Sequence, residues 1–370
     1  MSVSRLLIVG ASGRAAAASA LRADFDPFVL DLFADADTGR LCPVLKLPMD
    51  DYPHGFVELA KRVPPMPWMY TGGLENYPDV VAAISESREL WGNGPEVLRK
   101  VRDPIALSNW MKQFWKDHPA SVLTGREPSR EGSWLRKPLR GSAGHGIRFS
   151  KTEDLTDSTG RPDHYLQQFV DGPAMSAIFT NGRRGWPTFV GLTRQLMGTP
   201  WLHARPFAYA GNIIANLRHG PDTRPTAGWL TFEFPLVGVW GFDFIFSNGR
   251  AAVVEVNPRY TASAEIIEHA TGIPVLTQTE PVVAKSTVGK AIYYAPHRIA
   301  FPATGPWDDS LAHCTDVWRR PDFADIPHAG DTIEAGHPVL TLFAEAQDEE
   351  ECEAKLKARA SELDRLFAVG

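Results

Sequence analysis

Two acidic residues and an amide stand at regular spacing on two apolar segments in the second half of the chain. Asp243 lies on the first segment and Glu255 and Asn257 on the second, with the turn-forming run Ser247-Asn248-Gly249 between them. This pattern predicts a β-hairpin. A turn centred on Gly249 would place Asp243 opposite Glu255, and alternation along a strand would place Asn257 on the same face. Two carboxylates and an amide oxygen on one face are ligands suited to Mg²⁺, which also accepts phosphate oxygens.

Arg259 follows two residues after Asn257 and is expected on that same face, where it could contact a phosphate or an oxyanion. The alternative is an ordinary hairpin whose acids face solvent. We favour the metal site, because both acids lie inside otherwise apolar strands, where an unpaired charge is unfavourable.

A lysine followed by a glycine-rich run forms the second candidate site. Lys137 precedes a run that contains Gly141, Ser142, Gly144 and Gly146. Glycines let backbone N–H groups approach phosphate oxygens closely, and the lysine would meet the phosphates as a mobile cation. Taken alone, a glycine loop in a hairpin is usually only a turn. The later acidic hairpin makes the phosphate-binding interpretation specific.

The third candidate is the apolar strand that ends in Gln167, Gln168, Phe169 and Val170. Such a strand, followed by a hinge-like turn, could offer backbone groups to adenine and polar groups to ribose. In isolation an ordinary core strand is the better interpretation.

The elements around these residues predict an α/β protein. An apolar strand at residues 6–10, a glycine turn, an alanine-rich helix and a second strand ending at Asp31 open a doubly wound parallel sheet. We place a first domain at residues 1–100, a second at 101–285 and a small β-rich third at 286–370. In the third we expect strands at 291–294, 316–319 and 339–343, followed by an amphipathic helix at 348–366.

In this order, the lysine, glycine loop, glutamine strand and acidic hairpin resemble the ATP-grasp superfamily over roughly residues 100–280. The resemblance implies a parallel-sheet pre-grasp domain, a grasp fold of two lobes and an appended small domain. It also implies Mg-ATP (or Mn-ATP), with Asp243, Glu255 and Asn257 as metal ligands. Lys137 would contact the phosphates under a closing loop of residues 141–146, and residues 167–170 would form the adenine linker. A second basic residue is expected near residue 103, and Arg102 is the substitute for it.

The shared reaction of that superfamily is activation of a carboxylate as an acyl phosphate, followed by displacement of phosphate by an amine. Arg259 and Lys137 would stabilise the reacting phosphoryl group. Arg194, Gln195, Tyr209 and Asn212 are candidates for substrate contacts. Short segments of the sequence also resemble uncharacterised ATP-grasp proteins linked to methanofuran- or methanopterin-type cofactor synthesis. This resemblance suggests a product in which glutamate is joined to an amine.

Parts of the sequence are also compatible with three other functions. A nicotinamide oxidoreductase could use Gly10, Gly13 and Asp31 as a dinucleotide fingerprint. A non-catalytic ATP-binding module would keep the nucleotide site without turnover. A bicarbonate-using carboxylase is less favoured, because Ser263 falls where that subfamily has an acid.

Composition limits the partners. The formal net charge of −6 argues against a general nucleic-acid surface, and no apolar run approaches the length of a membrane span. We expect a cytoplasmic enzyme acting on small-molecule carboxylates and amines, with a homodimer as one option. The three cysteines are too far apart to suggest a disulfide framework or a thiolate metal site.

Overall fold

The chain begins with a parallel sheet covered by helices. The computed structural model describes residues 4–115, 118–123, 133–151, 154, 163–181, 186–215 and 220–368. The first sheet has the strand order β3-β2-β1-β4, and all of its strand pairs are parallel. The alanine-rich helix α1 connects β1 to β2 and packs on β2, as the sequence predicts. The bounds are β1 Ser4–Val9, α1 Arg14–Arg22, β2 Phe25–Asp31, α2 Ala36–Leu41, β3 Val44–Lys46, α3 Gly55–Lys61, β4 Trp68–Tyr70, the 3-10 helix η2 Leu74–Asn76, α4 Pro78–Ser85 and α5 Pro95–Val101.

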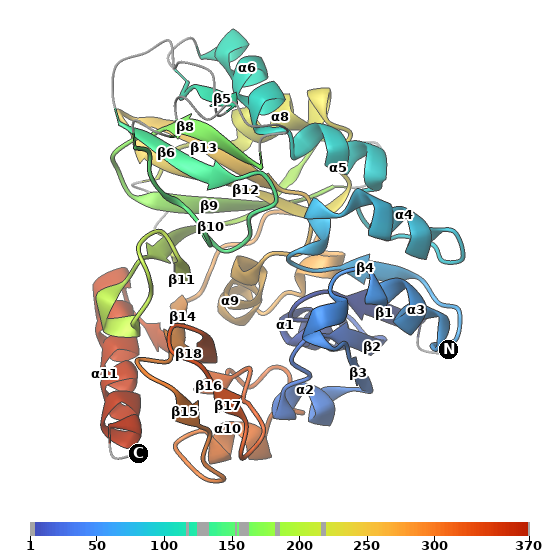
Figure 1. Ribbon diagram of the computed structural model, residues 1–370, viewed down its shortest axis with the longest axis vertical. Coiled ribbons are helices and arrows are strands. Elements are labelled where there is room, and N and C mark those ends of the chain that lie inside the picture. The colour runs from blue at the N-terminus through green and yellow to red at the C-terminus, as the bar shows by residue number, and fades with distance from the viewer. Residues whose placement is uncertain are drawn as a thin grey trace.

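A small antiparallel sheet forms the next part, at the top of the view in Figure 1. Its strand order is β5-β8-β6-β7. Helix α6 begins after Asp103, whose carboxylate accepts hydrogen bonds from the backbone N–H groups of Ile105 and Ala106 and so caps the helix. The bounds are α6 Pro104–Phe114, β5 Ser121–Leu123, β6 Trp134–Pro138, β7 Arg148–Phe149 and β8 His164–Gln168.

The largest sheet has eight strands in the order β13-β12-β9-β10-β11-β14-β18-β16. Its first five strands belong to the predicted grasp domain and its last three to the C-terminal region. The two groups join where β11 pairs antiparallel with β14. The bounds are β9 Ala174–Asn181, β10 Thr188–Met197, β11 Tyr209–Ile214, α8 Arg224–Glu233, β12 Gly238–Ser247, β13 Arg250–Asn257, α9 Ala262–Thr271, β14 Thr287–Tyr294, β16 Phe323–Ala324 and β18 Pro338–Ala346.

The C-terminal region also contains a short strand pair and two helices, with bounds β15 Ile299–Ala300, α10 Asp308–Ala312, β17 Thr332–Ile333 and α11 Glu349–Phe367. The expected strands near 291–294 and 339–343 and the terminal helix are confirmed. The expected strand at 316–319 is wrong, because that segment is a turn after α10. The division into three domains remains a proposal, since β14, β16 and β18 continue the sheet of the preceding strands.

Helix α9 lies centrally, between the large sheet and the N-terminal domain (Figure 1). It contacts α1 on one side and strands β10, β11 and β14 on the other. Buried residues of both regions form one hydrophobic cluster there, including Ile8, Ala17, Ile178 and Ile267. In the described part of the chain, no helix is both long and apolar enough to cross a membrane.

Candidate active site

The predicted hairpin is formed by β12 and β13, and its register brings the two acids together. Ser247 pairs with Arg250 across a two-residue turn, Asn248-Gly249, in which both φ angles are positive. Continued without interruption, this register would place Val254 opposite Asp243. A bulge at Val254 shifts the pairing by one residue, and Asp243 therefore pairs with Glu255. The predicted pairing is confirmed, although the turn is not centred on Gly249.

The three proposed metal ligands share one face of this hairpin. The Nδ2 group of Asn257 donates a hydrogen bond to Oδ2 of Asp243 over 3.0 Å, and Oδ1 of Asn257 accepts one from Arg259 over 3.2 Å. Burial and the neighbouring charge of Glu255 raise the pKa of Asp243 to about 6. The two carboxylates thus face each other in a half-buried place, which favours a cation between them.

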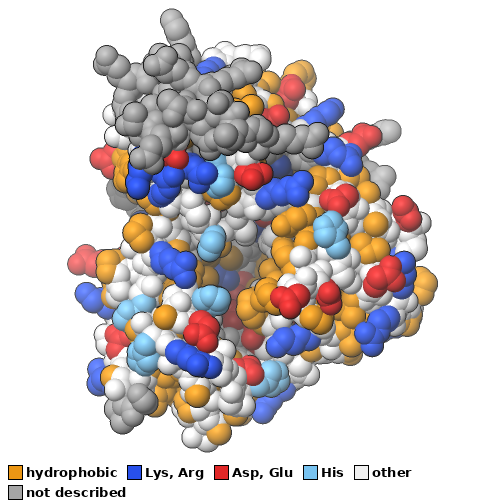
Figure 2. Space-filling model, in the orientation of Figure 1, with side chains coloured by type: hydrophobic (Ala, Val, Ile, Leu, Met, Phe, Trp, Pro, Cys, Tyr) orange, Lys and Arg blue, Asp and Glu red, His pale blue; other side chains and the backbone are white. Residues whose placement is uncertain are grey.

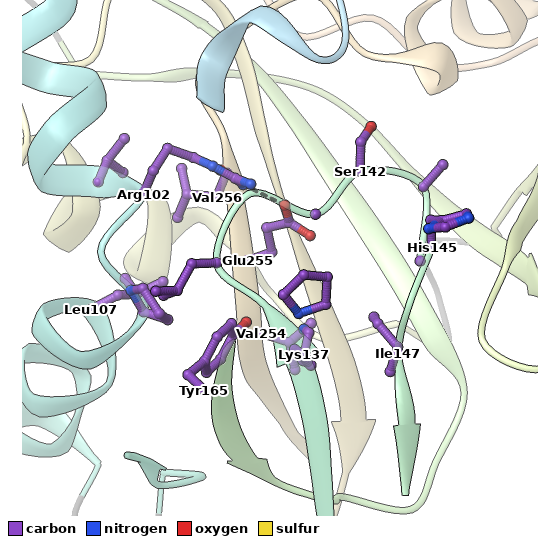
Figure 3. Close-up of a pocket in the computed structure, with 17 residues that line it drawn as sticks. Arg102, Leu107, Lys137, Ser142, His145, Ile147, Tyr165, Val254, Glu255 and Val256 are labelled. Atoms are coloured by element: carbon purple, nitrogen blue, oxygen red, sulfur yellow. Dashed lines mark hydrogen bonds and ion pairs between the residues drawn. The ribbon is translucent and has the colours of Figure 1, made fainter. Parts of the chain in front are cut away.

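Basic side chains surround Glu255 on its other side (Figure 3). Arg102 forms a close ion pair with Glu255 and donates to the carbonyl oxygen of Val256 over 3.2 Å. Burial would raise the pKa of Glu255, but Arg102 and Lys137 outweigh it and hold this pKa below its usual range. Lys137 is only 9 % exposed and donates to Oε1 of Gln167 over 3.1 Å.

The glycine loop between β6 and β7 lies across the cleft in a closed position. At Gly144 (φ +74°) an added Cβ atom would stand 1.8 Å from the carbonyl oxygen of Phe207, so only glycine permits this approach. The backbone N–H of Tyr209 donates to the carbonyl oxygen of Ala143 over 3.0 Å. The loop therefore touches the large sheet, although it belongs to the small one.

These residues surround a cleft with an empty volume of about 2100 Å³, part of it open to solvent. Figure 2 shows the face of the molecule that is hollowed where the three parts meet. Most predicted site residues line this cleft, namely Lys137, Ser142, Gly144, Gln167, Gln168, Phe169, Val170, Gln195, Tyr209, Asp243, Glu255, Asn257 and Arg259. Arg102 and Gly141 line an adjoining pocket of about 520 Å³, which shares Lys137 and Glu255 with the cleft. Gly146 lines neither cavity.

Two of the predicted substrate residues lie elsewhere. Arg194 is ion-paired with Glu349 and Glu353 of α11, at 3.1 and 2.6 Å, and does not line the cleft. Asn212 is fully buried, and its amide bonds to Tyr209 and Thr193. These positions contradict a direct substrate contact in this conformation, because the polar groups of both residues are used within the protein.

Four further residues of the cleft wall were not predicted. Glu75 comes from η2 in the N-terminal domain and is ion-paired with Arg259 at 2.8 Å. Ser12 lines the cleft from the first glycine turn, and Lys290 and Asp325 line it from the C-terminal region. Ser12 lies within the glycine turn singled out above, but Lys290 and Asp325 belong to no local motif and are brought to the site by the packing of distant segments.

The first glycine turn does not have the free acid that a dinucleotide site needs. Asp31 is buried and accepts hydrogen bonds from the backbone N–H groups of Gly13, Phe33 and Ala34, at 2.6, 2.7 and 3.0 Å. Gly13 packs against Val29, where a Cβ atom would be 2.5 Å from a methyl group. Both residues therefore serve the packing of the N-terminal domain, and Asp31 is not available for a ribose.

Comparison with known proteins agrees with this geometry. A family model described as an ATP-grasp domain matches residues 103–263. An uncharacterised protein of Methanocaldococcus jannaschii is 22 % identical over 262 residues, which are 68 % of this chain. The match spans 63 % of that relative, slightly less than two thirds of its length.

Solved structures match over nearly the whole chain. N5-carboxyaminoimidazole synthetase from Staphylococcus aureus, complexed with ADP, gives a TM-score of 0.68 at 13 % identity and covers 96 % of this chain and 97 % of its own. L-amino acid ligase from Bacillus licheniformis gives 0.69 at 15 % identity and covers 97 % of both chains. The biotin carboxylase domain of 2-oxoglutarate carboxylase from Hydrogenobacter thermophilus, solved with MgADP and bicarbonate, gives 0.65 at 13 % identity and covers 92 % of this chain and 86 % of its own.

Residues 103–263 thus match the model of an ATP-grasp domain, and the chain as a whole has the fold of the synthetase and ligase structures to which it is similar.

Proposed function

We propose that the protein is an ATP-dependent, ADP-forming ligase that joins a carboxylate to an amine through an acyl phosphate. The observation that carries this proposal is the opposed pair Asp243 and Glu255, which lines one cleft together with Lys137 and the closed glycine loop. Asp243 accepts a hydrogen bond from Asn257, which in turn accepts one from Arg259. The similarity to ligase structures supports it.

The donor set fits a divalent cation that carries the nucleotide. Burial and the charge of Glu255 raise the pKa of Asp243 to about 6 and outweigh the opposite effects of Asn257 and Arg259. No group of three or more His, Cys, Asp or Glu side chains suited to a metal occurs in the described part of the chain. Asp243, Glu255 and Asn257 lie together on the hairpin and line the cleft, and they would hold Mg²⁺ together with phosphate oxygens. When bound, the ion would neutralise charge on the transferring phosphoryl group.

The nucleotide would lie between the two sheets. Gln167, Gln168, Phe169 and Val170 line the end of the cleft formed by β8 and the segment after it, and they would receive adenine and ribose. Lys137 would contact the phosphates from β6. Its pKa is raised, because Tyr165 and Glu255 outweigh the effect of burial, so it stays charged at neutral pH.

The reaction then has two steps. An oxygen of the substrate carboxylate attacks the γ-phosphorus of ATP, the bond to the β-phosphate bridging oxygen breaks, and ADP leaves. The amine nitrogen next attacks the acyl carbon, the bond from carbon to the phosphate oxygen breaks, and the nitrogen loses a proton. Arg259 would stabilise negative charge on the acyl oxygen, and the closed glycine loop would exclude water from the acyl phosphate.

The specific substrates are a finer part of the proposal. We propose an amino acid such as glutamate as the carboxylate and an amine of a C1-carrying cofactor, of the methanofuran or methanopterin type, as the acceptor. The mixed charge of the cleft wall supports this choice. Arg259, Lys290 and Asp325 all line it, each also ion-paired within the protein, so both signs of charge are near a substrate that carries a carboxylate and an ammonium group. Gln195 and Tyr209, which line the cleft beside the hairpin, remain proposed substrate contacts.

The test measures binding and turnover separately. Calorimetric titration of the purified protein should show binding of Mg-ATP and none of NAD. Phosphate release should then rise when glutamate and an aryl amine are added together, with formation of the amide detected by mass spectrometry. Binding of NAD without Mg-ATP would reverse the proposal. Mg-ATP binding without phosphate release across a wide panel of carboxylates and amines would favour the non-catalytic ATP-binding module.

A further inference from the structure

The 3-10 helix η2, at residues Leu74–Asn76 of the N-terminal domain, presents two consecutive buried side chains to the candidate site. Glu75, 1 % exposed, is ion-paired with Arg259 at 2.8 Å. Asn76, 7 % exposed, contacts Arg102 and the glycine loop. One short element of the first domain thus reaches both arginines that lie beside the acidic hairpin.

The amide of Asn76 uses its two ends for two different partners. Its oxygen Oδ1 accepts hydrogen bonds from Nη2 and Nε of Arg102, over 2.8 and 3.2 Å. Its nitrogen Nδ2 donates to the carbonyl oxygen of Gly141 over 3.1 Å. This orientation follows from the partners, since a guanidinium can only donate and a carbonyl can only accept.

Both partners matter for a bound triphosphate. Arg102 forms the ion pair with Glu255 at the edge of the shared pocket, as Figure 3 shows. Gly141 is the first glycine of the glycine loop. Two residues further on, Ala143 of the same loop contacts Tyr209 of the large sheet. Asn76 therefore joins the cation beside Glu255 to the segment that covers the phosphates.

We propose that Asn76 is a positioning residue, whose amide oxygen orients Arg102 and whose amide nitrogen holds the glycine loop closed. The proposal has two halves. The Arg102 half, in which Asn76 orients Arg102, rests on the proposed function. The loop half, in which Asn76 holds the loop closed, depends only on the contact with Gly141. Because Asn76 belongs to the N-terminal domain, the loop closes fully only when that domain is seated against the grasp domain. Closure of the loop over the nucleotide site therefore depends on the position of the N-terminal domain, which also supplies part of the cleft wall.

A second buried asparagine provides a matched control. Asn93 also ties the N-terminal domain to the large sheet, through Nδ2 bonds of 3.0 Å to the carbonyl oxygens of Val237 and Pro258. Its side chain also accepts a hydrogen bond from the N–H of Val237, over 2.9 Å, and none of these bonds involves Arg102 or the glycine loop. Asn93→Ala should loosen the same domain contact without removing either bond of Asn76.

The loop half is tested by hydrogen exchange of the nucleotide-free, full-length protein. Asn76→Asp keeps an acceptor for Arg102 but turns an oxygen toward the carbonyl of Gly141, and Asn76→Ala removes both bonds. Loss of one buried hydrogen bond should raise exchange across residues 139–147 about fivefold in both variants. Asn93→Ala should leave that segment at the wild-type rate. Wild-type exchange in Asn76→Asp, or an equal rise in Asn93→Ala, would overturn the loop half.

The Arg102 half is tested by calorimetric Mg-ATP affinity. Both Asn76 variants lose the loop bond, so the difference between them reports the bond to Arg102. We expect Asn76→Ala to bind Mg-ATP about fivefold more weakly than Asn76→Asp, and this difference to vanish in the Arg102→Ala background. A difference that persists without Arg102 would overturn this half. Absence of Mg-ATP binding by the wild-type protein would overturn the proposed function and this half with it, while the exchange result would still decide the loop half.

Discussion

Acidic side chains at two places line or underlie the same cleft, and the fold compensates their negative charges to different extents. Glu265 on α9 is fully buried and ion-paired with Arg14 of the N-terminal domain at 2.6 Å and with Lys290 of β14 at 3.1 Å. Burial would raise the pKa of Glu265, but these two cations lower it well below its usual range. At the hairpin, Asp243 faces Glu255 and its pKa is raised to about 6.

This difference separates a structural charge from a functional one. Glu265 connects the first domain, α9 and the C-terminal strands, and its charge is fully compensated within the fold. Asp243 lacks that compensation, which fits the proposed binding of a cation from solution. An acidic side chain is the better guide to function when the fold compensates its charge only in part and when it lies in a cleft with basic side chains suited to phosphates.

The largest expected effect is on stability, in Glu265→Gln. Removing this carboxylate leaves Lys290 buried without its ion-pair partner and takes one of the acidic partners from Arg14. We therefore expect the free energy of unfolding to fall by about 3–5 kcal/mol at pH 7. Because the folded pKa of Glu265 is lowered, its contribution is present above its ordinary pKa and is lost as the pH falls through the folded value. The loss in Glu265→Gln should therefore shrink in acid.

Urea unfolding between pH 3 and 8 measures this effect, with Glu350→Gln on the exposed surface of α11 as the control. A loss below about 1 kcal/mol in Glu265→Gln, comparable to a surface substitution, would contradict the structural role given to Glu265.

Glu255→Gln should act on turnover and not on the fold. It removes one proposed metal carboxylate at nearly constant shape, and we expect substrate-stimulated phosphate release to fall about 10²–10³-fold. Circular dichroism should show an unchanged fold. Full activity of Glu255→Gln would show that the hairpin is not the metal site.

Gly144→Ala should weaken Mg-ATP binding about tenfold, since loss of loop closure is a local effect of about 1–2 kcal/mol. An alanine there would meet the carbonyl oxygen of Phe207 and would also be strained by the φ angle of +74°. Gly330→Ala is the control, because Gly330 has a similar φ of +87° with nothing within 4 Å of an added Cβ. Equal nucleotide affinity of both variants would mean that the contact with Phe207 is not needed.

The smallest effect is expected in Asp243→Asn, and its sign is opposite to that of Glu265→Gln. A raised folded pKa means that the ionised carboxylate is unfavourable in the folded protein above about pH 6. In EDTA, Asp243→Asn should therefore gain about 1 kcal/mol above that pH and lose the gain below the ordinary pKa of an aspartate. Urea unfolding in EDTA at pH 5 and pH 8 measures this gain, and a loss of stability at pH 8 would contradict the comparison.

The acidic hairpin could be predicted from sequence, because alternation and turn chemistry act over a few residues. Even there, the reason for the pairing was only partly right. The two-residue turn at Asn248-Gly249 and the bulge at Val254 each change the register by one residue relative to a turn centred on Gly249, and the changes cancel for Asp243 and Glu255. Side-chain spacing predicts such a pair but not the irregularity that produces it.

Residues that act through tertiary contacts could not be predicted in this way. Asn76 and Arg102 are separated by 26 positions, and Glu75 and Arg259 by far more, so no periodicity links them. Arg194 shows the reverse error. It lies on a strand beside the cleft, as expected, but α11 packs against its side chain and supplies two glutamates.

The unbroken pairing from β13 to β16 determines which part of the molecule can move. The acidic hairpin, Lys290 and the C-terminal strands belong to one hydrogen-bonded body, whereas Lys137 and the glycine loop belong to the separate four-stranded sheet. On the proposed function, opening of the site would displace the small sheet and break the loop's contacts with Asn76 and Tyr209. The proposed cation ligands and Lys290 would keep their mutual geometry during this movement, so binding of the acceptor need not wait for the nucleotide to be enclosed.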